Sequence, residues 1–280
     1  MKQLVVCLLI GLAIVIPVDA QKLTLLWKTD PVFKVPESVL FDAKTNVLYV
    51  SNIDGASSER DGRGFISRID PNGNILELEW VKELNAPKGM GISGGNLYVA
   101  DLGEVAVIDI ALSKIVKKIE IKGARLLNDV AIDDDENIYV SDSGTGKVHR
   151  VMSDGTYDTY FYSTDFARIN GLLALKDSEL YIADAGSGIH YRLSADKKLS
   201  EFSRTSQGAD GIVRVGRNGF IVSSWGGELY FVDEEGVANK LLDTRENNLN
   251  SADIAFNSRK RVLYVPTFLG NSVMAYSFAR

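Results

Sequence analysis

The sequence predicts an all-β protein, a six-bladed β-propeller with four antiparallel strands in each blade. Three observations support this prediction. A segment of two strands joined by a polar turn recurs six times, successive copies lie about 40 to 50 residues apart, and no helix-period stretch of useful length separates them. Repeats of roughly 40 residues with several strands each are typical of propellers, which form one blade per repeat.

The repeats align on the residue that anchors their second strand. The six segments are PESVLFDAKTNVLYVSN, PKGMGISGGNLYVAD, LNDVAIDDDENIYVSD, INGLLALKDSELYIAD, ADGIVRVGRNGFIVSS and ADIAFNSRKRVLYVPT. Their anchors are Tyr49, Tyr98, Tyr139, Tyr181, Ile221 and Tyr264. Only the interval after the first anchor is widened, by an insertion around residues 57–61. We therefore expect residues 21–280 to form a single propeller domain.

Each repeat is expected to hold four strands. In the third repeat they span residues 130–132, 137–141, 147–152 and 156–162, with hairpin-forming Asp, Asn, Gly and Ser clusters between them. Outer strands recur at residues 75–81, 115–121, 199–203 and 238–242. The sixth repeat supplies only three strands, ending at Phe278, so the isolated strand at residues 23–28 is expected to complete that blade. This pairing closes the ring and removes an exposed sheet edge.

Residues 1–20 have the pattern of a secretory signal peptide. Lys2 precedes an apolar run over residues 4–18, and Val18-Asp19-Ala20 forms a cleavage site before Gln21. The run is shorter than the roughly 20 residues of a spanning helix. A lipoprotein box ending at Cys7 is a weaker interpretation, because too few residues precede it. We expect a periplasmic or secreted protein whose mature part has no cysteine for disulfides, thiolate catalysis or zinc.

Composition narrows the classes of partner and chemistry. The net charge is −6 with both signs evenly spread, so no basic patch for nucleic acid is expected. No second apolar run is long enough for a membrane span, and a monomer acting on a small molecule is expected. His149 and His190 belong to third strands by the repeat register, where we expect them to pack. A Ser-His-Asp hydrolase is therefore not expected.

Several conspicuous motifs are better explained as turns. The acidic DDDEN of residues 133–137 lacks the glycine and flanking helices of an EF-hand, and GTGK at residues 144–147 opens a strand instead of a helix. The GxGxxG letters of residues 89–94 occupy a strand and its turn. Asp101, Asp142 and Asp184 end second strands before glycine-bearing turns, where we expect them to accept turn hydrogen bonds.

A polar residue opens the first strand of each repeat. Counting back from the anchors by ten to twelve positions gives Glu37, Lys88, Asn128, Asn170, Asp210 and Asp253. First strands line the central channel of a propeller, so these side chains should converge on its axis. Carboxylate and amide oxygens suit a hard cation such as Ca²⁺. Turn and capping roles are the alternative for any one of these residues, but they do not explain Glu37.

The chain resembles the family of gluconolactonases, senescence marker protein and luciferin-regenerating-enzyme-like proteins, which is related to squid diisopropyl fluorophosphatase. The motifs that carry the resemblance are Pro36-Glu37-Ser38, Leu127-Asn128-Asp129, Asn170-Gly171-Leu172 and Gly208-Ala209-Asp210-Gly211. The resemblance implies a catalytic divalent cation, usually calcium, held by Glu37, Asn128, Asn170 and Asp210. It also implies that Trp225, in Ser224-Trp225-Gly226, lines the substrate pocket.

Two positions depart from the family pattern. Lys88 enters the ring where the family has no matching cation; it would repel the metal, pair with Asp210 or Asp253, or bind a substrate carboxylate. The family's lactonases carry an arginine two residues before the middle Asn to hold a sugar acid. Here Leu126 stands there and Arg125 precedes it, on the opposite face of an extended segment. Specificity for a sugar acid is therefore not implied.

The resulting expectation is an exported calcium-dependent hydrolase of lactones or esters. Asp210 is the expected general base for water, because its motif carries that role in the resembling enzymes. Asp253 and Lys88 are the next candidates for proton transfer or anchoring. Two alternatives stay open: a non-catalytic binding propeller in which Lys88 forms a salt-bridged plug, and a hydrolase that uses the same metal site on phosphotriesters.

Overall fold

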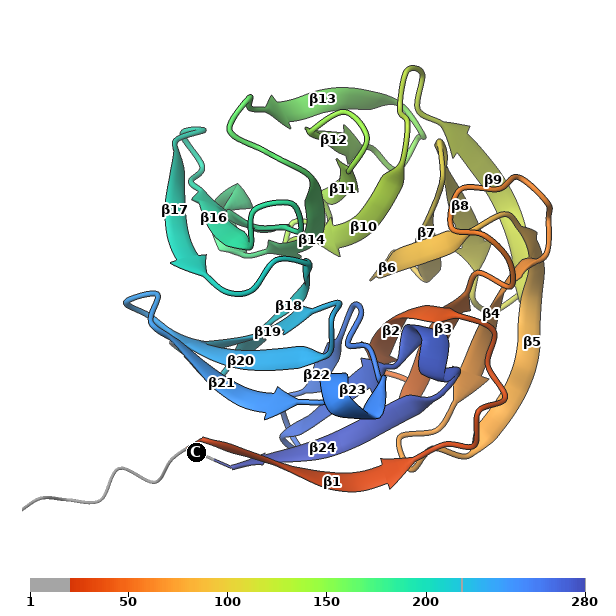
Figure 1. Ribbon diagram of the computed structural model, residues 1–280. Helices are drawn as coiled ribbons and strands as arrows, with labels where there is room; N and C mark the ends of the chain where they lie inside the picture. Colours follow the sequence, from red (N-terminus) through yellow and green to blue (C-terminus); the bar gives the residue numbers. More distant parts are fainter. Residues whose placement is uncertain (1–20, 218, 280) are drawn as a thin grey trace, which may run out of the picture.

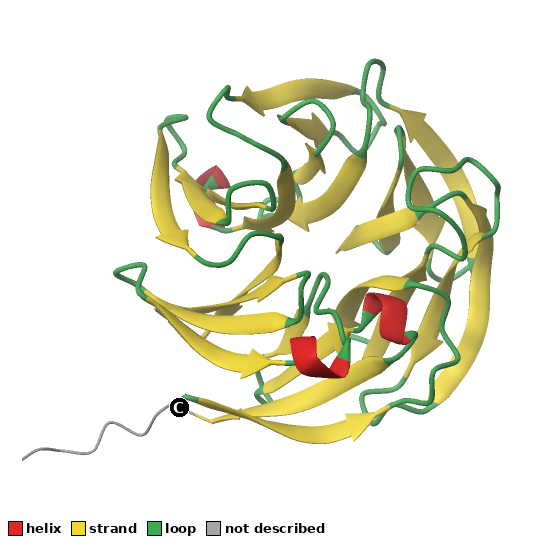
Figure 2. Ribbon diagram, viewed as in Figure 1, coloured by secondary structure: helices red, strands yellow, loops and turns green. Residues whose placement is uncertain are grey.

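The chain forms a ring of six four-stranded antiparallel sheets around a common axis, as Figure 1 shows. This computed structural model describes residues 21–217 and 219–279, so the expected signal peptide lies outside the described residues. Strands dominate the described part of the chain, and Figure 2 shows that its helical elements are short turns. These 3₁₀ turns are η1 (Lys176–Ser178), η2 (Arg245–Asn247) and η3 (Phe268–Gly270). The predicted six-bladed β-propeller is confirmed.

The blades follow the chain in order. Blade I comprises β2 (Pro36–Asp42), β3 (Val47–Asn52), β4 (Gly64–Ile69) and β5 (Ile75–Leu84). Blade II comprises β6 (Pro87–Ser93), β7 (Asn96–Asp101), β8 (Glu104–Asp109) and β9 (Lys114–Glu120). Blade III comprises β10 (Leu127–Ile132), β11 (Ile138–Asp142), β12 (Lys147–Val151) and β13 (Tyr157–Tyr162).

The remaining blades repeat the same order, with one exchange. Blade IV comprises β14 (Ile169–Ala174), β15 (Leu180–Asp184), β16 (Ile189–Leu193) and β17 (Leu199–Arg204). Blade V comprises β18 (Ala209–Val215), β19 (Gly219–Ser224), β20 (Glu228–Asp233) and β21 (Ala238–Asp243). Blade VI comprises β22 (Ala255–Asn257), β23 (Val262–Pro266), β24 (Val273–Ala279) and, from the start of the chain, β1 (Lys22–Lys28).

Strand β1 closes the ring. It pairs antiparallel with β24, from Lys22 opposite Ala279 to Lys28 opposite Met274, so the two ends of the described chain lie side by side (Figure 1). The predicted closure by the N-terminal strand is confirmed. Because β24 would otherwise expose a full edge of backbone N–H and C=O groups, this pairing also protects the sheet from edge-to-edge association.

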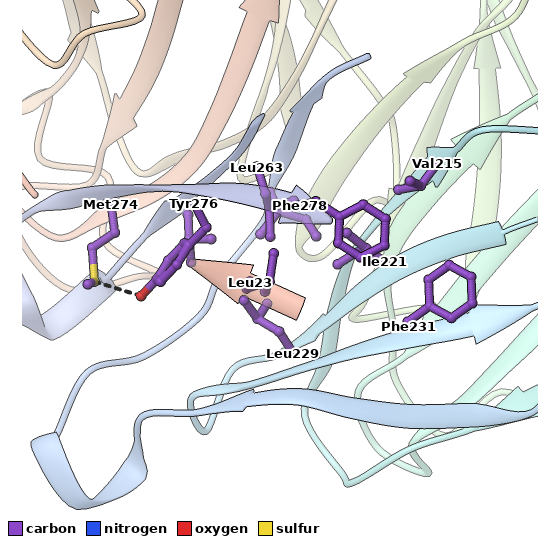
Figure 3. Packing of buried hydrophobic residues seen from close by; sticks show 11 residues of the cluster. Leu23, Val215, Ile221, Leu229, Phe231, Leu263, Met274, Tyr276 and Phe278 are labelled. Carbon is purple, nitrogen blue, oxygen red and sulfur yellow. Dashed lines mark hydrogen bonds between the residues drawn. The ribbon is translucent and has the colours of Figure 1, made fainter. Parts of the chain in front are cut away.

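The hydrophobic core lies mainly between neighbouring blades. Figure 3 shows the cluster between blades V and VI, in which Ile221 and Phe231 meet Leu263, Phe278 and the β1 residue Leu23. Each fully buried side chain of this size contributes about 1.5 to 3 kcal/mol through the hydrophobic effect. Hydrophobic packing between their faces therefore holds neighbouring blades together. The starts of the first strands are not needed for this packing and can present polar residues to the channel.

A register shift marks the start of the first strand in blades I to V. It falls between Pro36 and Ser38 in β2, and at the matching place in β6, β10, β14 and β18. A bulge of this kind adds a residue to one strand and re-aims the neighbouring side chain. Its position in the repeats coincides with the polar residues predicted to face the axis.

No helix in the described part of the chain is long and apolar enough to span a membrane.

Candidate functional site

A cavity of about 340 Å³ lies at the end of the channel where the first strands begin. Its wall comes from two kinds of segment, the starts of first strands and the connections that follow second strands. The lining residues are Glu37, Ile53, Ser57, Lys88, Leu126, Asn128, Ser143, Arg168, Asn170, Ala185, Gly208, Asp210, Trp225 and Phe268. The structure thus brings together Trp225 and every predicted ring residue except Asp253.

Asp253 lies one position later in its repeat than the other ring residues, in the segment that leads into β22. The anchors Tyr49 and Tyr264 face Leu40 and Ala255, and three residues before these positions stand Glu37 and Ala252. Asp253 therefore aligns with Ser38, with which it forms a parallel bridge. The alignment of Asp253 with Glu37 was wrong by one residue, because the hairpin of blade VI has the longer turn of blade I.

This second level of the channel is narrow and acidic. Its members are Ser38, Gly89, Asp129, Gly171, Gly211 and Asp253. The hydroxyl of Ser38 donates a hydrogen bond to Asp253 Oδ2. Any Cβ at Gly89 would collide with Asp129, and one at Gly211 would collide with Asp253. Glycine at these two positions therefore makes room for two carboxyl groups directly beneath the cavity.

Three oxygens of the predicted ligand set have no hydrogen-bond partner within the described structure. They are Oε2 of Glu37, Oδ1 of Asn170 and Oδ1 of Asp210, all buried and supplied by three different blades. Buried polar atoms are nearly always paired, and leaving one unpaired costs about 1 to 3 kcal/mol. Three such atoms on one cavity leave lone pairs available to a cation or to a hydrogen-bond donor such as water.

The pKa values of three channel carboxyl groups are raised. Burial raises the pKa of Glu37 to about 8, with Lys88 opposing and Asp129 adding to the shift. Burial, and then the charges of Glu37 and Asp129, hold the pKa of Asp210 well above its usual range. Burial likewise raises the pKa of Asp129 to about 6. Bringing a positive charge among these groups would favour their ionised forms.

Lys88 does not supply that charge by direct pairing. Its ammonium group donates hydrogen bonds to the carbonyl oxygens of Ser57, at 3.0 Å, and Ala86, at 3.1 Å. Within the described residues it forms no ion pair with Asp210 or Asp253. Burial lowers the pKa of Lys88, against the attraction of Glu37. Lys88 therefore fastens the inserted loop of blade I beside the cavity and leaves the channel carboxyl groups without a salt bridge.

The donor set fits a hard cation. Glu37 and Asp210 offer carboxylate oxygens and Asn128 and Asn170 offer amide oxygens, which is the chemistry that calcium prefers. Among the described residues no group of three or more His, Cys, Asp and Glu side chains is arranged as a metal site. The candidate site has two acidic and two amide residues, and its unpaired oxygens are what distinguish it from a packed polar cluster.

The aspartates at the ends of second strands have the turn role that the sequence predicted. Asp101 accepts hydrogen bonds from the backbone N–H groups of Asn85 and Ala86. Asp142 and Asp184 accept the equivalent pairs, from Arg125 and Leu126 and from Ala167 and Arg168. These contacts fix the connection that leads into each first strand. They therefore position the ring residues without facing the cavity themselves.

Both histidines lie in third strands, away from the cavity, as expected. His149 is in β12 and His190 in β16, and both are buried. The sequence reasoning missed Arg168, Ser57 and Phe268, which line the cavity. For Arg168 a signal was present, because it precedes Asn170 by the same two residues that separate Leu126 from Asn128.

Comparisons with known proteins bear on the fold. No protein-family model and no curated protein sequence matches the chain. Virginiamycin B lyase from Staphylococcus aureus has a similar structure, with a TM-score of 0.64 and 12% identity over 92% of this chain and 99% of that one. An auxiliary nutrient binding protein from Bacteroides ovatus has a TM-score of 0.67 and 12% identity over 89% of this chain and 70% of that one.

A solved streptogramin B lyase is similar to the same degree, with a TM-score of 0.66 and 11% identity over 93% of this chain and 98% of that one. Lyases and a binding protein thus share this architecture, so the fold alone does not choose an activity. These similarities show that the chain is a six-bladed β-propeller of the kind found in virginiamycin B lyase.

Proposed function

We propose that this protein is an exported calcium-dependent hydrolase of lactone or ester substrates, with its chemistry in the axial cavity. One observation carries the proposal. Buried oxygens of Glu37, Asn170 and Asp210, from three blades, line the same cavity and lack hydrogen-bond partners within the described structure. The resemblance of the four ring motifs to the gluconolactonase family supports the same cation and the same class of reaction.

Glu37, Asn128, Asn170 and Asp210 would hold the cation. Bound calcium supplies Lewis-acid polarisation of a substrate carbonyl and stabilises negative charge on its oxygen, an effect worth several kcal/mol. The donor residues stand on bulged first strands whose neighbouring blades are packed face to face. The set is therefore preorganised, which is the condition for such stabilisation to act without reorganisation.

Asp210 is the proposed general base. Its carboxyl group lines the cavity with one unpaired oxygen, and a bound cation would favour its ionised form, which can accept a proton from water. Asp253 lies at the level beneath the cavity, where it accepts a hydrogen bond from Ser38 and burial holds its pKa well above the usual range, so it is not placed to contact a substrate. Lys88 has two of its three N–H groups engaged by carbonyl oxygens. Its third N–H is available to a substrate oxygen in the cavity that Lys88 lines.

The similar lyases suggest a different chemistry that this cavity does not support. One solved virginiamycin B lyase is a histidine-to-alanine variant described as catalytically inactive. In the described part of this chain, neither His149 nor His190 lines the cavity. Proton transfer here would therefore fall to the carboxyl groups and Lys88 of the cavity, which is consistent with hydrolysis by an activated water.

Calorimetric titration of calcium into chelator-treated protein tests the cation site. We expect one-to-one binding that Asp210→Ala abolishes, and that Asp196→Ala, an exposed substitution with the same charge change, leaves intact. Calcium at a hundred times its dissociation constant should add about 2.7 kcal/mol to the free energy of unfolding. Absence of calcium binding by the wild type would overturn the proposal.

A substrate panel of lactones, aryl esters and phosphotriesters tests the reaction. Calcium-dependent hydrolysis of lactones or esters supports the proposal. Turnover of phosphotriesters alone would replace the substrate class, and calcium binding without any turnover would identify a binding propeller. The same Asp210→Ala and Asp196→Ala pair separates turnover in the cavity from contaminating activity.

A further inference from the structure

Residues two positions before the ring residues form the mouth of the cavity. They are Val35, Ala86, Leu126, Arg168 and Gly208, of which Leu126, Arg168 and Gly208 line the cavity wall. Arg168 is the one charged residue among these five. Its backbone is fixed on both sides, because its N–H donates to Asp184 Oδ1 at 2.8 Å and its carbonyl accepts from Ala185 N–H at 2.9 Å.

The side chain of Arg168 has no hydrogen bond or ion pair in the described structure, although its backbone is held. Most arginines on this protein are engaged; Arg150, for example, pairs with Asp158, and Arg245 with Asp243. Arg168 lines the same cavity as the ring residues Asn170 and Asp210. A guanidinium group with free donors, on a backbone held by hydrogen bonds, thus lines the cavity.

Apolar residues from other blades form another part of the cavity wall. Trp225 follows β19 and is 40% exposed, and its ring meets the edge of Phe268 with centroids 5.5 Å apart. Phe268 has a φ of 46°, a left-handed conformation that costs a bulky residue about 1 to 3 kcal/mol. Its partners in the mouth are Ile53 and Leu126, which belong to one hydrophobic cluster with it.

Arg168 and this apolar wall would bind opposite ends of one ligand. An arginine fork binds a carboxylate through two parallel charge-assisted hydrogen bonds. A wall of Trp225, Phe268 and Leu126 offers surface to an apolar ring, and its one side-chain hydrogen-bond donor is the indole N–H of Trp225. Most hydroxyl groups of a sugar buried there would lose their hydrogen bonds to water without replacement.

We propose that the substrate is an amphipathic lactone or ester that carries a separate carboxylate, bound by Arg168, and an apolar or aromatic body, packed on Trp225 and Phe268. This inference rests on the proposed function for the reacting group, and it makes Arg168 a specificity-determining residue. A polyhydroxylated sugar lactone is accordingly a poor substrate.

Equilibrium binding of two non-reactive probes, phenylacetate and phenylacetamide, tests the inference without turnover. The probes share the ring and differ in charge. By calorimetry on calcium-treated protein, we expect Arg168→Gln to weaken phenylacetate binding about 10- to 100-fold and to leave phenylacetamide unchanged. Trp225→Ala should weaken both probes, because it removes the surface for their common ring.

Arg125→Gln is the matched control, since Arg125 stands in the equivalent connection before blade III, donates its N–H to Asp142, and does not line the cavity. We expect this control to bind phenylacetate like the wild type. Equal weakening by the two arginine variants, equal affinity for the two probes, tighter binding of gluconate than of phenylacetate, or no binding at all would each overturn the inference.

Turnover distinguishes this inference from the proposed function. Arg168-dependent phenylacetate binding by a protein that hydrolyses nothing would overturn the hydrolase and keep the carboxylate site. Hydrolysis of neutral and carboxylate-bearing lactones with equal KM, unaltered in Arg168→Gln, would keep the hydrolase and overturn the carboxylate site.

Discussion

Asp184 and Asp210 are aspartates in adjacent blades with the same burial and opposite surroundings. Asp184 is 0% exposed and Asp210 is 2% exposed. Asp184 accepts hydrogen bonds from the N–H groups of Ala167, Arg168 and Gly186. Asp210 has an oxygen with no partner in the described structure, and its pKa is held well above the usual range by burial and by neighbouring carboxyl groups.

The difference shows that local N–H supply, and not depth, separates an acid whose oxygens are satisfied from one with an unpaired oxygen. Asp142 shows the same effect in its pKa. Burial alone would raise the pKa of Asp142, but the nearby His149 ring and hydrogen bonds from the Thr145 hydroxyl and backbone N–H groups hold it well below its usual range. The strand-end acids lie where a connection turns back and points its N–H groups inward. The ring acids lie on bulged strands whose N–H groups point elsewhere.

The largest effect should come from Asp184→Asn. The change keeps the shape but replaces one acceptor oxygen with an NH₂ group that faces backbone donors. We expect the free energy of unfolding to fall by about 2 to 4 kcal/mol, because charge-assisted hydrogen bonds are lost and buried N–H groups lose their acceptor. Urea denaturation measures this loss. An unchanged midpoint would show that burial alone defines this position.

The same substitution at Asp210 should have the opposite sign in chelator-treated protein. Asn removes a buried acid that has no compensating partner, so the free energy of unfolding at pH 7 should rise by about 1 to 2 kcal/mol. The gain should disappear when calcium is added, since only the wild type is then stabilised. Urea denaturation with and without calcium provides the measurement. Destabilisation of the calcium-free variant would mean that Asp210 is a structural acid like Asp184.

The sequence was sufficient for the blades and for most of the ring because both depend on local periodicity. Polar residues recur at one place in each repeat, and a bulge at that place turns Glu37, Asn128 and Asn170 toward one axis. Asp253 was misplaced because its level depends on the length of a hairpin turn. A shift of one residue moves a side chain to a different level of the channel.

Lys88, and in part Arg168, show what local patterns do not contain. The spacing of Arg168 from Asn170 was a local signal, but the contact that holds its backbone was not. The pairing of Lys88 with Ser57 depends on how an inserted loop folds over the next blade, which has no repeat to align with. Arg168 occupies the mouth because Asp184 holds its backbone, a contact between residues 16 positions apart in the chain. Such contacts follow from tertiary packing and become visible only in the structure.

The comparison between acids with and without hydrogen-bond partners extends to a buried basic residue, His190. His190 is fully buried in β16, with Nε2 3.0 Å from Thr205 Oγ1 and no partner for Nδ1 in the described structure. Burial lowers the pKa of His190 to about 4, from 6.5. Between these two values the unfolded chain binds more protons than the folded protein, so stability falls as the pH drops through this window and is fully present above it.

We expect His190 to account for about 1 to 2 kcal/mol of the loss in unfolding free energy between pH 7 and pH 5. His190→Asn should flatten this part of the profile, and Thr205→Val, which keeps the imidazole, should not. Urea denaturation at a series of pH values measures the slopes. If the Asn variant retained the wild-type slope, then the imidazole would be protonated in the folded protein.

The smallest effect should come from Ser141→Ala, at the contact between blades III and IV. The Ser141 hydroxyl accepts a hydrogen bond from Asp129 N–H at 2.9 Å and donates one to the carbonyl of Asn170 at 2.6 Å, so it ties the backbones of blades III and IV at the ring. Its loss should cost about 1 kcal/mol. Calcium affinity should also fall a few-fold, because Asn170 loses the contact that fixes its backbone. Ser200→Ala, which removes an exposed hydroxyl of β17, is the control and should change neither quantity. If stability falls but calcium affinity does not, the bulges alone position the ring residues. Residues that stabilise the fold, such as Asp184, would then be separate from residues proposed to bind calcium, such as Asp210.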